Sequence, residues 1–308
     1  MSVLDDVAAA LGPRAVRDAP LGARSTYRVG GTAALLVEAT APRDLAVLGD
    51  AIGDRDVEVL VVGRGSNLLV CDAGFDGVAV VLAGEFEVID EAHGAEDGAL
   101  HVRAGGAVAY PVLARRTAEQ GLRGLEWAVG IPGSVGGAVR MNAGGHGSDT
   151  AASLVSAELV ELRGGAARTC RADELGFGYR SSVLATSEVV TAATFALQRG
   201  DVGEAKAQLA EIVRWRRAHQ PGGANAGSVF ANPPGDHAGR LIEAVGAKGR
   251  RHGTAMVSEK HANFIQADPG GSADDVVALM EEVRDDVRDA TGVELVAEVV
   301  LVGFGARR

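Results

Sequence analysis

The sequence predicts an α+β fold in which short strands alternate with helices. Short β-rich runs bounded by turn residues recur along the first two thirds of the chain. Near the C-terminus, apolar residues at helical spacing lie between clear start and stop signals. Glycine contributes 43 of the 308 residues, about twice the usual frequency. This surplus indicates many tight turns, or backbone held close to a ligand.

Length and charge limit the possible classes of function. A chain of 308 residues suits two or three domains. The net charge of −11 disfavours wholesale binding to nucleic acid or to an anionic membrane. No apolar run approaches the ~18 residues that span a bilayer, and the N-terminus lacks the basic segment of a signal peptide. We therefore expect a cytoplasmic protein. Cys71 and Cys170 stand in no metal-ligand spacing, so no metal site is expected.

The first predicted domain covers residues 1–85. A short helix and then a loop with Pro13 and Pro20 are expected before residue 20. Further on, β-rich runs and one helical pattern indicate an α/β unit. Strands are expected at Ala33–Ala39, Val57–Val62, Leu68–Cys71 and Val78–Leu82, and a helix at Arg43–Ile52.

The second predicted domain covers residues 86–200. A helix is expected at Ala107–Gln120, between two glycines and Gly121. A structureless loop is expected from Gly130 to Gly147, and a loop that long inside a compact domain is usually functional. Strands are expected at Phe86–Asp90, Leu100–Ala104, Ala157–Leu162 and Val189–Leu197.

The third predicted domain covers residues 201–308. A helix is expected at Val202–Arg217. Ser272 can cap a second helix, which the turn residue Gly292 ends. Its apolar residues recur at the spacing of one helix face: Val276, Leu279, Met280, Val283 and Val287. A final strand, Val293–Val302, follows.

Two glycine-rich segments have the composition of pyrophosphate-binding loops, because backbone N–H groups can reach a phosphate only where no side chain intervenes. Ordinary glycine turns are the alternative for each. No Gly-x-Gly-x-x-Gly or Walker motif occurs, so neither a Rossmann fold nor a P-loop is indicated. The first segment is Gly63, Arg64, Gly65, Ser66, Asn67 and Leu68; the second includes Gly130, Ile131, Pro132, Gly133, Ser134, Gly136, Gly137, Asn142, Gly144 and Gly147.

Three polar residues are candidates for catalysis, each with an ordinary alternative. Arg180 lies among glycines and aromatics, where it can clamp a carboxylate or form a surface salt bridge. Ser228 follows Gly227 and precedes an apolar pair, so it can face a pocket or serve as a turn hydroxyl. Glu298 shares one face of the predicted last strand with Val296 and Val300. It is either exposed at a rim or partly desolvated beside a site, and desolvation would raise its pKa.

These motifs together resemble the UDP-N-acetylenolpyruvoylglucosamine reductases, in their shorter type II form, from about Ala23 to Gly303. The resemblance is carried by Tyr27–Gly31, Gly63–Leu69, Gly130–Gly147, Gly176–Arg180, Ala226–Pro233, Val257–Phe264 and the strand around Glu298. It implies a two-domain FAD-binding unit of the vanillyl-alcohol-oxidase-like (PCMH) type, followed by a C-terminal α/β substrate-binding domain.

The resemblance also implies the chemistry. NADPH reduces FAD, and the flavin then reduces UDP-N-acetylenolpyruvoylglucosamine to UDP-N-acetylmuramate in peptidoglycan precursor synthesis. The two glycine loops would hold FAD. Arg180 and Glu298 match the pair that binds and polarises the substrate carboxylate, and Ser228 matches the proton donor. Substrate contacts would come from Tyr179, Gly227, Asn232, His219, Lys260 and His261.

Some positions depart from the family pattern. The resemblance places lysines where this chain has His219 and Ala231, and Arg140, Arg216, Arg217 and Lys248 are the candidates to replace them at the UDP diphosphate. Because Glu298 is distant in sequence from the glycine loops, we expect it to be built separately from the flavin site. A small-molecule UDP-sugar is the expected partner, with no nucleic acid, no membrane, and a monomer or weak homodimer. The rival hypotheses are an FAD-dependent oxidase of the same superfamily acting on another substrate, and a nucleotide-sugar-binding protein without turnover.

Overall fold

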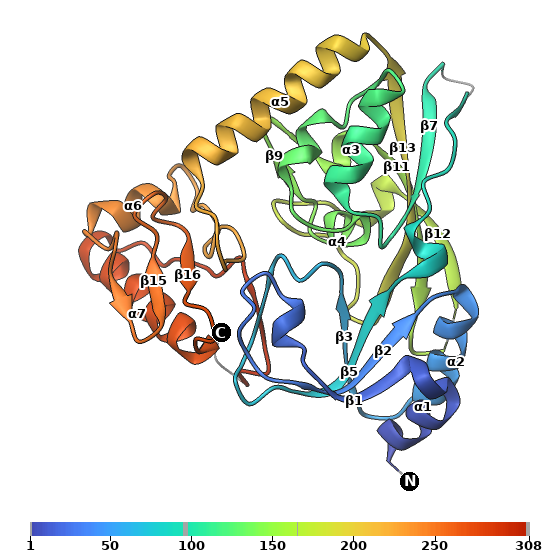
Figure 1. Cartoon of the computed structure of the whole chain (residues 1–308), viewed down its shortest axis with the longest axis horizontal. Helices are drawn as coiled ribbons and strands as arrows, with labels where there is room; N and C mark the ends of the chain where they lie inside the picture. The colour runs from blue at the N-terminus through green and yellow to red at the C-terminus, as the bar shows by residue number, and fades with distance from the viewer. Residues whose placement is uncertain (1, 95–97, 165, 306–308) are drawn as a thin grey trace. The chain divides into compact units, whose positions relative to one another are not determined.

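The computed structural model describes residues 2–94, 98–164 and 166–305, drawn in Figure 1. Two compact units divide the chain, and each combines segments that are distant in sequence. Unit 1 comprises residues 1–17, 35–64 and 77–216; unit 2 comprises residues 18–34, 65–76 and 217–308. The three-domain division at residues 85 and 200 stays a prediction.

A four-stranded sheet contains three of the four strands predicted in the first part of the chain, and the fourth, at residues 68–71, lies outside it. Its order is β1 (Ala15–Ala19), β2 (Ala33–Ala39), β5 (Phe75–Leu82) and β3 (Glu58–Val62), with β3 parallel to β5. The helices α1 (Val3–Leu11) and α2 (Pro42–Ile52) lie next to each other beside this sheet (Figure 1). Fully buried Leu35, Leu45 and Leu48 join sheet and helix in one apolar core. Alternating strand residues and the apolar stripe of α2 thus bury each other.

A larger antiparallel sheet forms the second part of unit 1. Its order is β12 (Ala167–Arg171), β11 (Leu154–Glu161), β13 (Glu188–Arg199), β7 (Leu100–Gly105) and β6 (His93–Gly94), and β8 (Leu122–Arg123) also pairs with β13. The helices of this part are α3 (Tyr110–Glu119), α4 (Val135–Arg140) and α5 (Val202–His219). Apolar residues of α5, such as Leu209 and Ile212, belong to the same core as Leu113 of α3 and Phe195 of β13.

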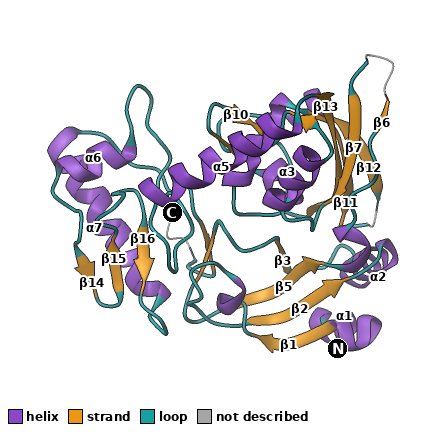
Figure 2. Cartoon of the chain, turned by 45° about the horizontal axis from the view of Figure 1, so that its top comes forward, coloured by secondary structure: helices purple, strands orange, loops and turns teal. Residues whose placement is uncertain are grey.

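Unit 2 contains a small antiparallel sheet, β14 (Arg251–His252), β15 (Ala255–Val257) and β16 (Ile265–Ala267), with α6 (Ala238–Ala244) and α7 (Ala273–Thr291) next to it (Figure 2). The predicted start and stop of α7 are confirmed. The Ser272 hydroxyl accepts a hydrogen bond from the N–H of Asp275 at 3.2 Å, and Gly292 ends the helix with φ 74°. The strands β4 (Leu68–Val70) and β17 (Val300–Val302) pair in parallel, also within unit 2.

Three expectations about local structure are wrong. Residues 86–90 do not form a strand. A 3-10 helix covers Gly84–Glu87 instead, and Phe86 is buried within it. Residues 130–147 are not structureless, because they contain α4 and the first strand of the hairpin β9 (Gly144–Gly145) and β10 (Ser148–Asp149). Pro13 begins no long loop, since β1 starts at Ala15.

The last strand is much shorter than Val293–Val302. β17 covers only the three residues that pair with Leu68–Val70 of β4, whereas residues 296–298 bond to a different segment, residues 229–231. Further 3-10 helices lie at Gly12–Arg14, Gly22–Arg24, Glu126–Gly130, Thr150–Ala152 and Ala172–Leu175.

Candidate active site

The two predicted phosphate loops meet within unit 1. A Cβ atom added to Gly63 would lie 2.6 Å from the Ser134 hydroxyl oxygen. That hydroxyl accepts a hydrogen bond from the N–H of Gly137 at 3.3 Å and so caps α4. Gly136 has little room, because an added Cβ would lie 3.1 Å from the carbonyl oxygen of Val190. The two loops therefore bring bare backbone together, as the binding of a pyrophosphate requires.

Replacing Gly63 by alanine should weaken FAD retention through Ser134. The new methyl group would displace the Ser134 hydroxyl from its capping hydrogen bond with the N–H of Gly137. Loss of such a cap costs about 1 kcal/mol of stability. The variant should lose FAD on gel filtration and melt at a lower temperature. In a Ser134→Ala background the added Cβ would meet only the Cβ of residue 134, at 3.6 Å, an ordinary contact. The Gly63→Ala change should then cost almost nothing further. Strictly additive losses in the double variant would contradict this coupling.

The remainder of the first loop is held within unit 2. Gly65 has φ 63°, and an added Cβ would lie 2.4 Å from the carbonyl oxygen of Arg24. The Gly65 carbonyl in turn accepts a hydrogen bond from the N–H of Thr26 at 3.0 Å. Only glycine fits this position, both in φ and in space. Residues 24–26 thus support Gly65, and the Tyr27–Gly31 motif begins at the next residue. The sequence suggested a role for that motif only through the resemblance.

The second loop ends in a tight hairpin that contacts helix α5. His146 and Gly147 form its turn with φ 54° and 85°, the left-handed pair that a two-residue hairpin turn requires. The His146 ring packs edge-on against Trp215, 5.2 Å between centroids. Burial, together with nearby Arg216, lowers the pKa of His146. Arg216 also donates a hydrogen bond to the Gly130 carbonyl. Arg216 thus supports this loop.

Arg180 lies at the tip of a four-residue turn in unit 1, between Gly178 and Ser181. Its φ of 53° is left-handed, as the third position of a type II turn requires, and glycine is the usual residue there. An arginine in this conformation is strained, and such strain clusters at functional sites. The guanidinium lies 5.3 Å from the centroid of the Tyr179 ring, and its Nη2 donates to the Gly144 carbonyl at 2.8 Å.

A second strained residue ties this turn to the second loop. Asn142 has φ 39°. Its amide donates to the Gly178 carbonyl at 3.1 Å and to the Asp149 carboxylate at 3.2 Å. Asn142, His146 and Arg180 are three of the five non-glycine residues with positive φ in the described part of the chain. The structure therefore joins the predicted cofactor loop and the predicted carboxylate clamp into one local framework.

Ser228 and Glu298 lie on neighbouring extended segments of unit 2. The N–H of Glu298 donates to the carbonyl of Val229 at 2.9 Å, and Phe230 forms an antiparallel bridge with Ala297. Ser228 is half-buried and directly follows Gly227, whose φ is 79°. Seventy residues separate Ser228 from Glu298, and only the tertiary structure brings the two segments together. Arg180 belongs to unit 1, and its convergence with this pair on one ligand stays a prediction.

The expectation that Glu298 is built apart from the flavin loops is wrong. The Asn67 side-chain amide, in the first loop, donates to the Glu298 carbonyl at 3.1 Å. Just beyond, β17 pairs with β4, the strand that follows this loop. The predicted alternation holds in part: Val296 is 66% and Val300 39% exposed, and Glu298 between them is half-buried.

The predicted substrate contacts are distributed over both units. Tyr179, in unit 1, is 59% exposed. In unit 2, the side-chain oxygen of Asn232 accepts the N–H of Ala238 at 3.0 Å, which leaves its amide N–H₂ to other partners. Lys260 donates a hydrogen bond to the carbonyl of Arg217, near the end of α5. His219 is the last residue of that helix. Burial lowers the pKa of His261, which packs edge-on against Phe264. Their contacts with substrate stay predictions.

Comparisons with known proteins decide the family. The model of the UDP-N-acetylenolpyruvoylglucosamine reductase C-terminal domain matches residues 219–302, and that of an FAD binding domain matches residues 33–171. UDP-N-acetylenolpyruvoylglucosamine reductase 2 of Symbiobacterium thermophilum is 44% identical over 289 residues, or 93% of this chain and 92% of that protein. The reductase of Rubrobacter xylanophilus is 42% identical, covering 94% and 96%. The chain belongs to the UDP-N-acetylenolpyruvoylglucosamine reductase family.

Structure comparison agrees with this family. The UDP-N-acetylenolpyruvylglucosamine reductase (MurB) from Thermus caldophilus superposes with a TM-score of 0.80 at 35% identity, covering 94% of this chain and 98% of that one. The predicted α+β fold, with an FAD-binding part and a C-terminal domain, is confirmed. The protein is therefore an oxidoreductase of this reductase family with FAD as its cofactor, and the crowded glycines of the two loops fit such a group.

Four cations were suggested by the resemblance as contacts of the UDP diphosphate, and the structure shows what three of them bind. Arg140 donates to three backbone carbonyls, those of Leu184, Ala185 and Glu188, and therefore has little capacity left for a ligand. Lys248 forms an ion pair with Glu243 at 2.8 Å. Arg216 binds the Gly130 carbonyl. The contact of any of these four residues with the diphosphate stays a prediction.

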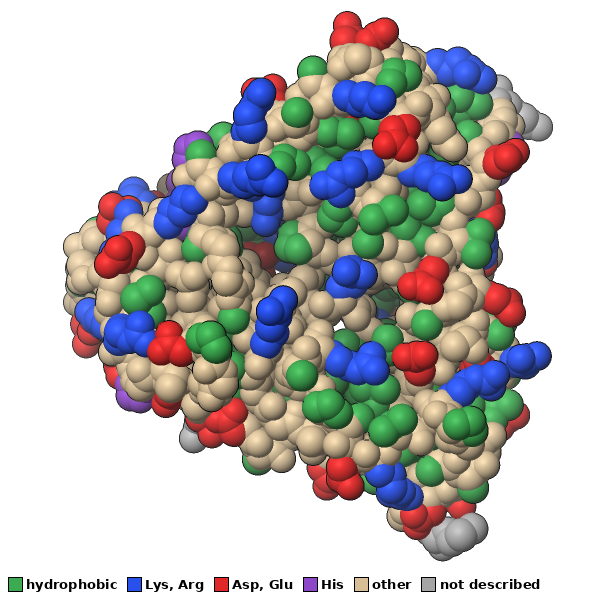
Figure 3. Space-filling view, viewed as in Figure 1, with side chains coloured by type: hydrophobic (Ala, Val, Ile, Leu, Met, Phe, Trp, Pro, Cys, Tyr) green, Lys and Arg blue, Asp and Glu red, His purple; other side chains and the backbone are tan. Residues whose placement is uncertain are grey.

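Charged side chains of both signs lie among apolar groups on the face drawn in Figure 3. Within residues 2–94, 98–164 and 166–305, no cluster of three or more His, Cys, Asp or Glu side chains could hold a metal ion. None of the helices described in these ranges has the length and apolar character to cross a membrane.

Proposed function

We propose that this protein uses NADPH to reduce UDP-N-acetylenolpyruvoylglucosamine to UDP-N-acetylmuramate in peptidoglycan precursor synthesis. The net change adds a hydride and a proton across the carbon–carbon double bond of the enolpyruvyl group. The bound flavin supplies hydride transfer between NADPH and this group. The cytoplasmic location and the oligomeric state stay predictions.

One observation supports this proposal above the others: Ser228, Glu298 and the FAD loop are adjoining parts of unit 2. The Val229 carbonyl accepts the N–H of Glu298, and Asn67 donates to the Glu298 carbonyl. The candidate proton donor and the candidate carboxyl group thus belong to segments that adjoin the predicted FAD loop. Reduction of an enolpyruvyl group needs this combination, because a proton must be delivered next to the carbon that receives hydride.

In this proposal the protein side chains stabilise the negative charge that develops on the substrate and deliver a proton to it. Hydride addition at the vinyl end drives negative charge into the substrate carboxylate. Arg180 and protonated Glu298 would donate hydrogen bonds to that carboxylate and so stabilise the transition state more than the ground state. Ser228 would deliver a proton to the adjacent carbon, which a hydroxyl can do when it is held in a water-poor site beside a developing carbanion.

An anaerobic two-step experiment tests the proposal. Purified protein should be yellow and should bleach when NADPH is added. Mixing the reduced protein with the enolpyruvyl substrate should restore the yellow colour and form UDP-N-acetylmuramate. Flavin that stays reduced with this substrate but is rapidly reoxidised by dioxygen would point to an oxidase with another substrate. A preparation that binds the UDP-sugar, yet cannot be bleached by NADPH, would indicate a binding protein without turnover.

A further inference from the structure

Asn263 forms three hydrogen bonds with the residues that follow Ser228. Its side-chain oxygen accepts the N–H of Phe230 at 3.0 Å, and its side-chain amide donates to the Phe230 carbonyl at 2.8 Å. Its main-chain carbonyl accepts the N–H of Val229 at 2.9 Å. The side chain is buried, with Asn263 only 3% exposed. Asn263 thus occupies one edge of the Val229–Ala231 segment.

The opposite edge of this segment belongs to the chain around Glu298. The Val229 carbonyl accepts the N–H of Glu298, and the N–H of Ala231 donates to the Val296 carbonyl, both at 2.9 Å. Hydrogen bonds thus leave residues 229–231 alternately to the two sides, as in a central strand. The position of Ser228 relative to Glu298 therefore depends on both edges, and Asn263 provides the edge remote from Glu298.

A primary amide suits this position because it imitates a strand neighbour. It presents one N–H donor and one carbonyl acceptor side by side, which is the pattern of a peptide group. The main chain cannot supply this pattern, since it turns here: the N–H of Phe264 donates to the His261 carbonyl at 3.0 Å. The turn is itself held by the Ser258 hydroxyl, which accepts the N–H of Lys260 at 3.1 Å.

We propose that Asn263 is a positioning residue that sets the place of the Ser228 hydroxyl relative to Glu298 for proton delivery. The inference rests on the proposed function, in which Ser228 is the proton donor. Asn263 makes no contact with the reacting atoms in this role. It acts through the backbone of Val229 and Phe230.

The Asn263→Asp variant tests this role through its pH profile. A protonated carboxyl group keeps one donor and one acceptor and can replace the amide, whereas a carboxylate has only acceptors and faces the Phe230 carbonyl. Burial should raise the pKa of the introduced carboxyl above its ordinary range. We expect reoxidation of reduced flavin by the enolpyruvyl substrate to stay within a few-fold of the wild-type rate at low pH. It should fall at least about tenfold as the carboxyl ionises. Bleaching by NADPH should change little at any pH.

Two further variants keep the test decisive. Val283→Ala removes buried volume from α7, where Val283 is 1% exposed, and should lower the melting temperature without a new pH dependence or a difference between the half-reactions. If Asn263→Asp does not fold, Asn263→Gln replaces it, because glutamine keeps the amide oxygen and the amide N–H₂ on a side chain one methylene longer. It should slow the substrate half-reaction selectively at every pH.

The outcomes separate this inference from the proposed function. Wild-type protein that is not reoxidised by the enolpyruvyl substrate refutes the proposed function, whatever the variants do. If the wild type is reoxidised, equal losses in both half-reactions of the Asn263 variants refute the positioning role alone. A pH profile of Asn263→Asp that is parallel to that of the wild type also refutes it.

Discussion

Replacing Ser228 by alanine should slow reoxidation of the reduced flavin by the enolpyruvyl substrate by about 10²–10⁴-fold, the usual range for loss of a positioned proton donor. The backbone of the next residue is held by Asn263 and Glu298, so the segment should keep its place when the hydroxyl is lost. Bleaching by NADPH should therefore be nearly unchanged. Rapid mixing with the flavin absorbance as the signal measures the two half-reactions separately.

Ser272→Ala provides a matched control for this prediction. It also removes a serine hydroxyl from unit 2, but one that caps α7 and accepts a hydrogen bond from Asp275. It should cost about 1 kcal/mol of stability and leave both half-reactions close to the wild-type rates. A Ser228→Ala protein with equal losses in both half-reactions would show that Ser228 is not the proton donor.

Removing the guanidinium of Arg180 should slow the same substrate half-reaction by about 10²–10³-fold, as expected for the loss of a donor that stabilises developing negative charge. Arg180→Ala and Arg180→Gly should lose activity equally. They should differ in stability, because residue 180 has φ 53° and a left-handed residue with a Cβ costs about 1–2 kcal/mol relative to glycine. We therefore expect the glycine variant to be the more stable of the two in urea unfolding.

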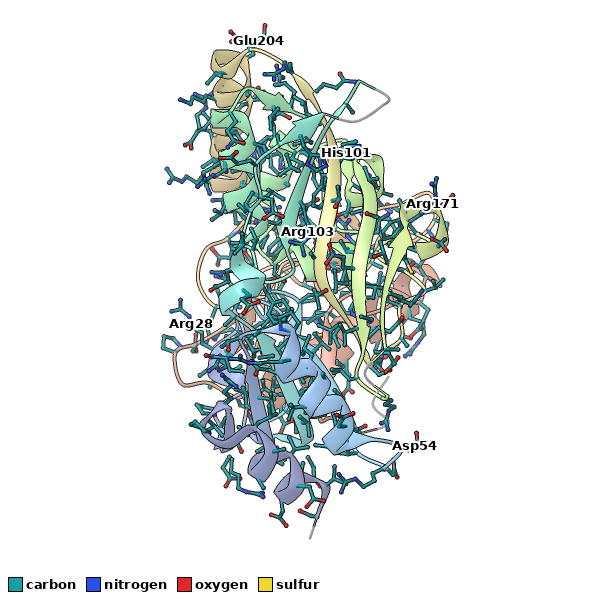
Figure 4. The ribbon with its side chains drawn as sticks, turned by 90° about the vertical axis from the view of Figure 1, so that its right-hand side faces the viewer. Arg28, Asp54, His101, Arg103, Arg171 and Glu204 are labelled. Atoms are coloured by element: carbon teal, nitrogen blue, oxygen red, sulfur yellow. The ribbon has the colours of Figure 1, made fainter. Side chains whose placement is uncertain are left out.

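Arg171→Ala is the control for the loss of positive charge. Arg171 lies at the outer edge of the sheet, with its side chain 78% exposed and paired with Asp173 (Figure 4). An exposed ion pair of this kind contributes about 0–1 kcal/mol, and its loss should leave both half-reactions unchanged. An Arg180→Ala protein that turns over substrate at the wild-type rate would contradict the carboxylate clamp.

Local patterns in the sequence predicted much of the secondary structure. The strand Ala33–Ala39 has the predicted bounds, and α2 differs by one residue from the predicted Arg43–Ile52. The cap, apolar face and stop of α7 were all visible in residues 272–292. Helix periodicity and capping depend on residues three or four positions apart, so no knowledge of the remaining chain is needed.

Non-local contacts explain what could not be predicted. The final strand covers only the three residues that pair with β4, more than two hundred residues away in sequence, because residues 296–298 bond to residues 229–231 instead. Arg216 supports the second glycine loop through the Gly130 carbonyl. Asn263 lay within a motif that resembles the family, yet no property of the motif itself indicated its bonds to Phe230. A search for buried amides beside a suspected catalytic segment needs coordinates.

The sequence by itself determined the α+β character, the two glycine loops and the three candidate catalytic side chains, because composition, turn chemistry and residue type are local properties. The tertiary structure alone decided that Gly63 meets Ser134 and that Arg180 joins the loop of Asn142. It also decided that Glu298 bonds to Val229, which follows Ser228, and to Asn67. These contacts join backbone groups that are far apart along the chain. Their formation depends on which segments the apolar cores bring together, and no short stretch of sequence contains that information.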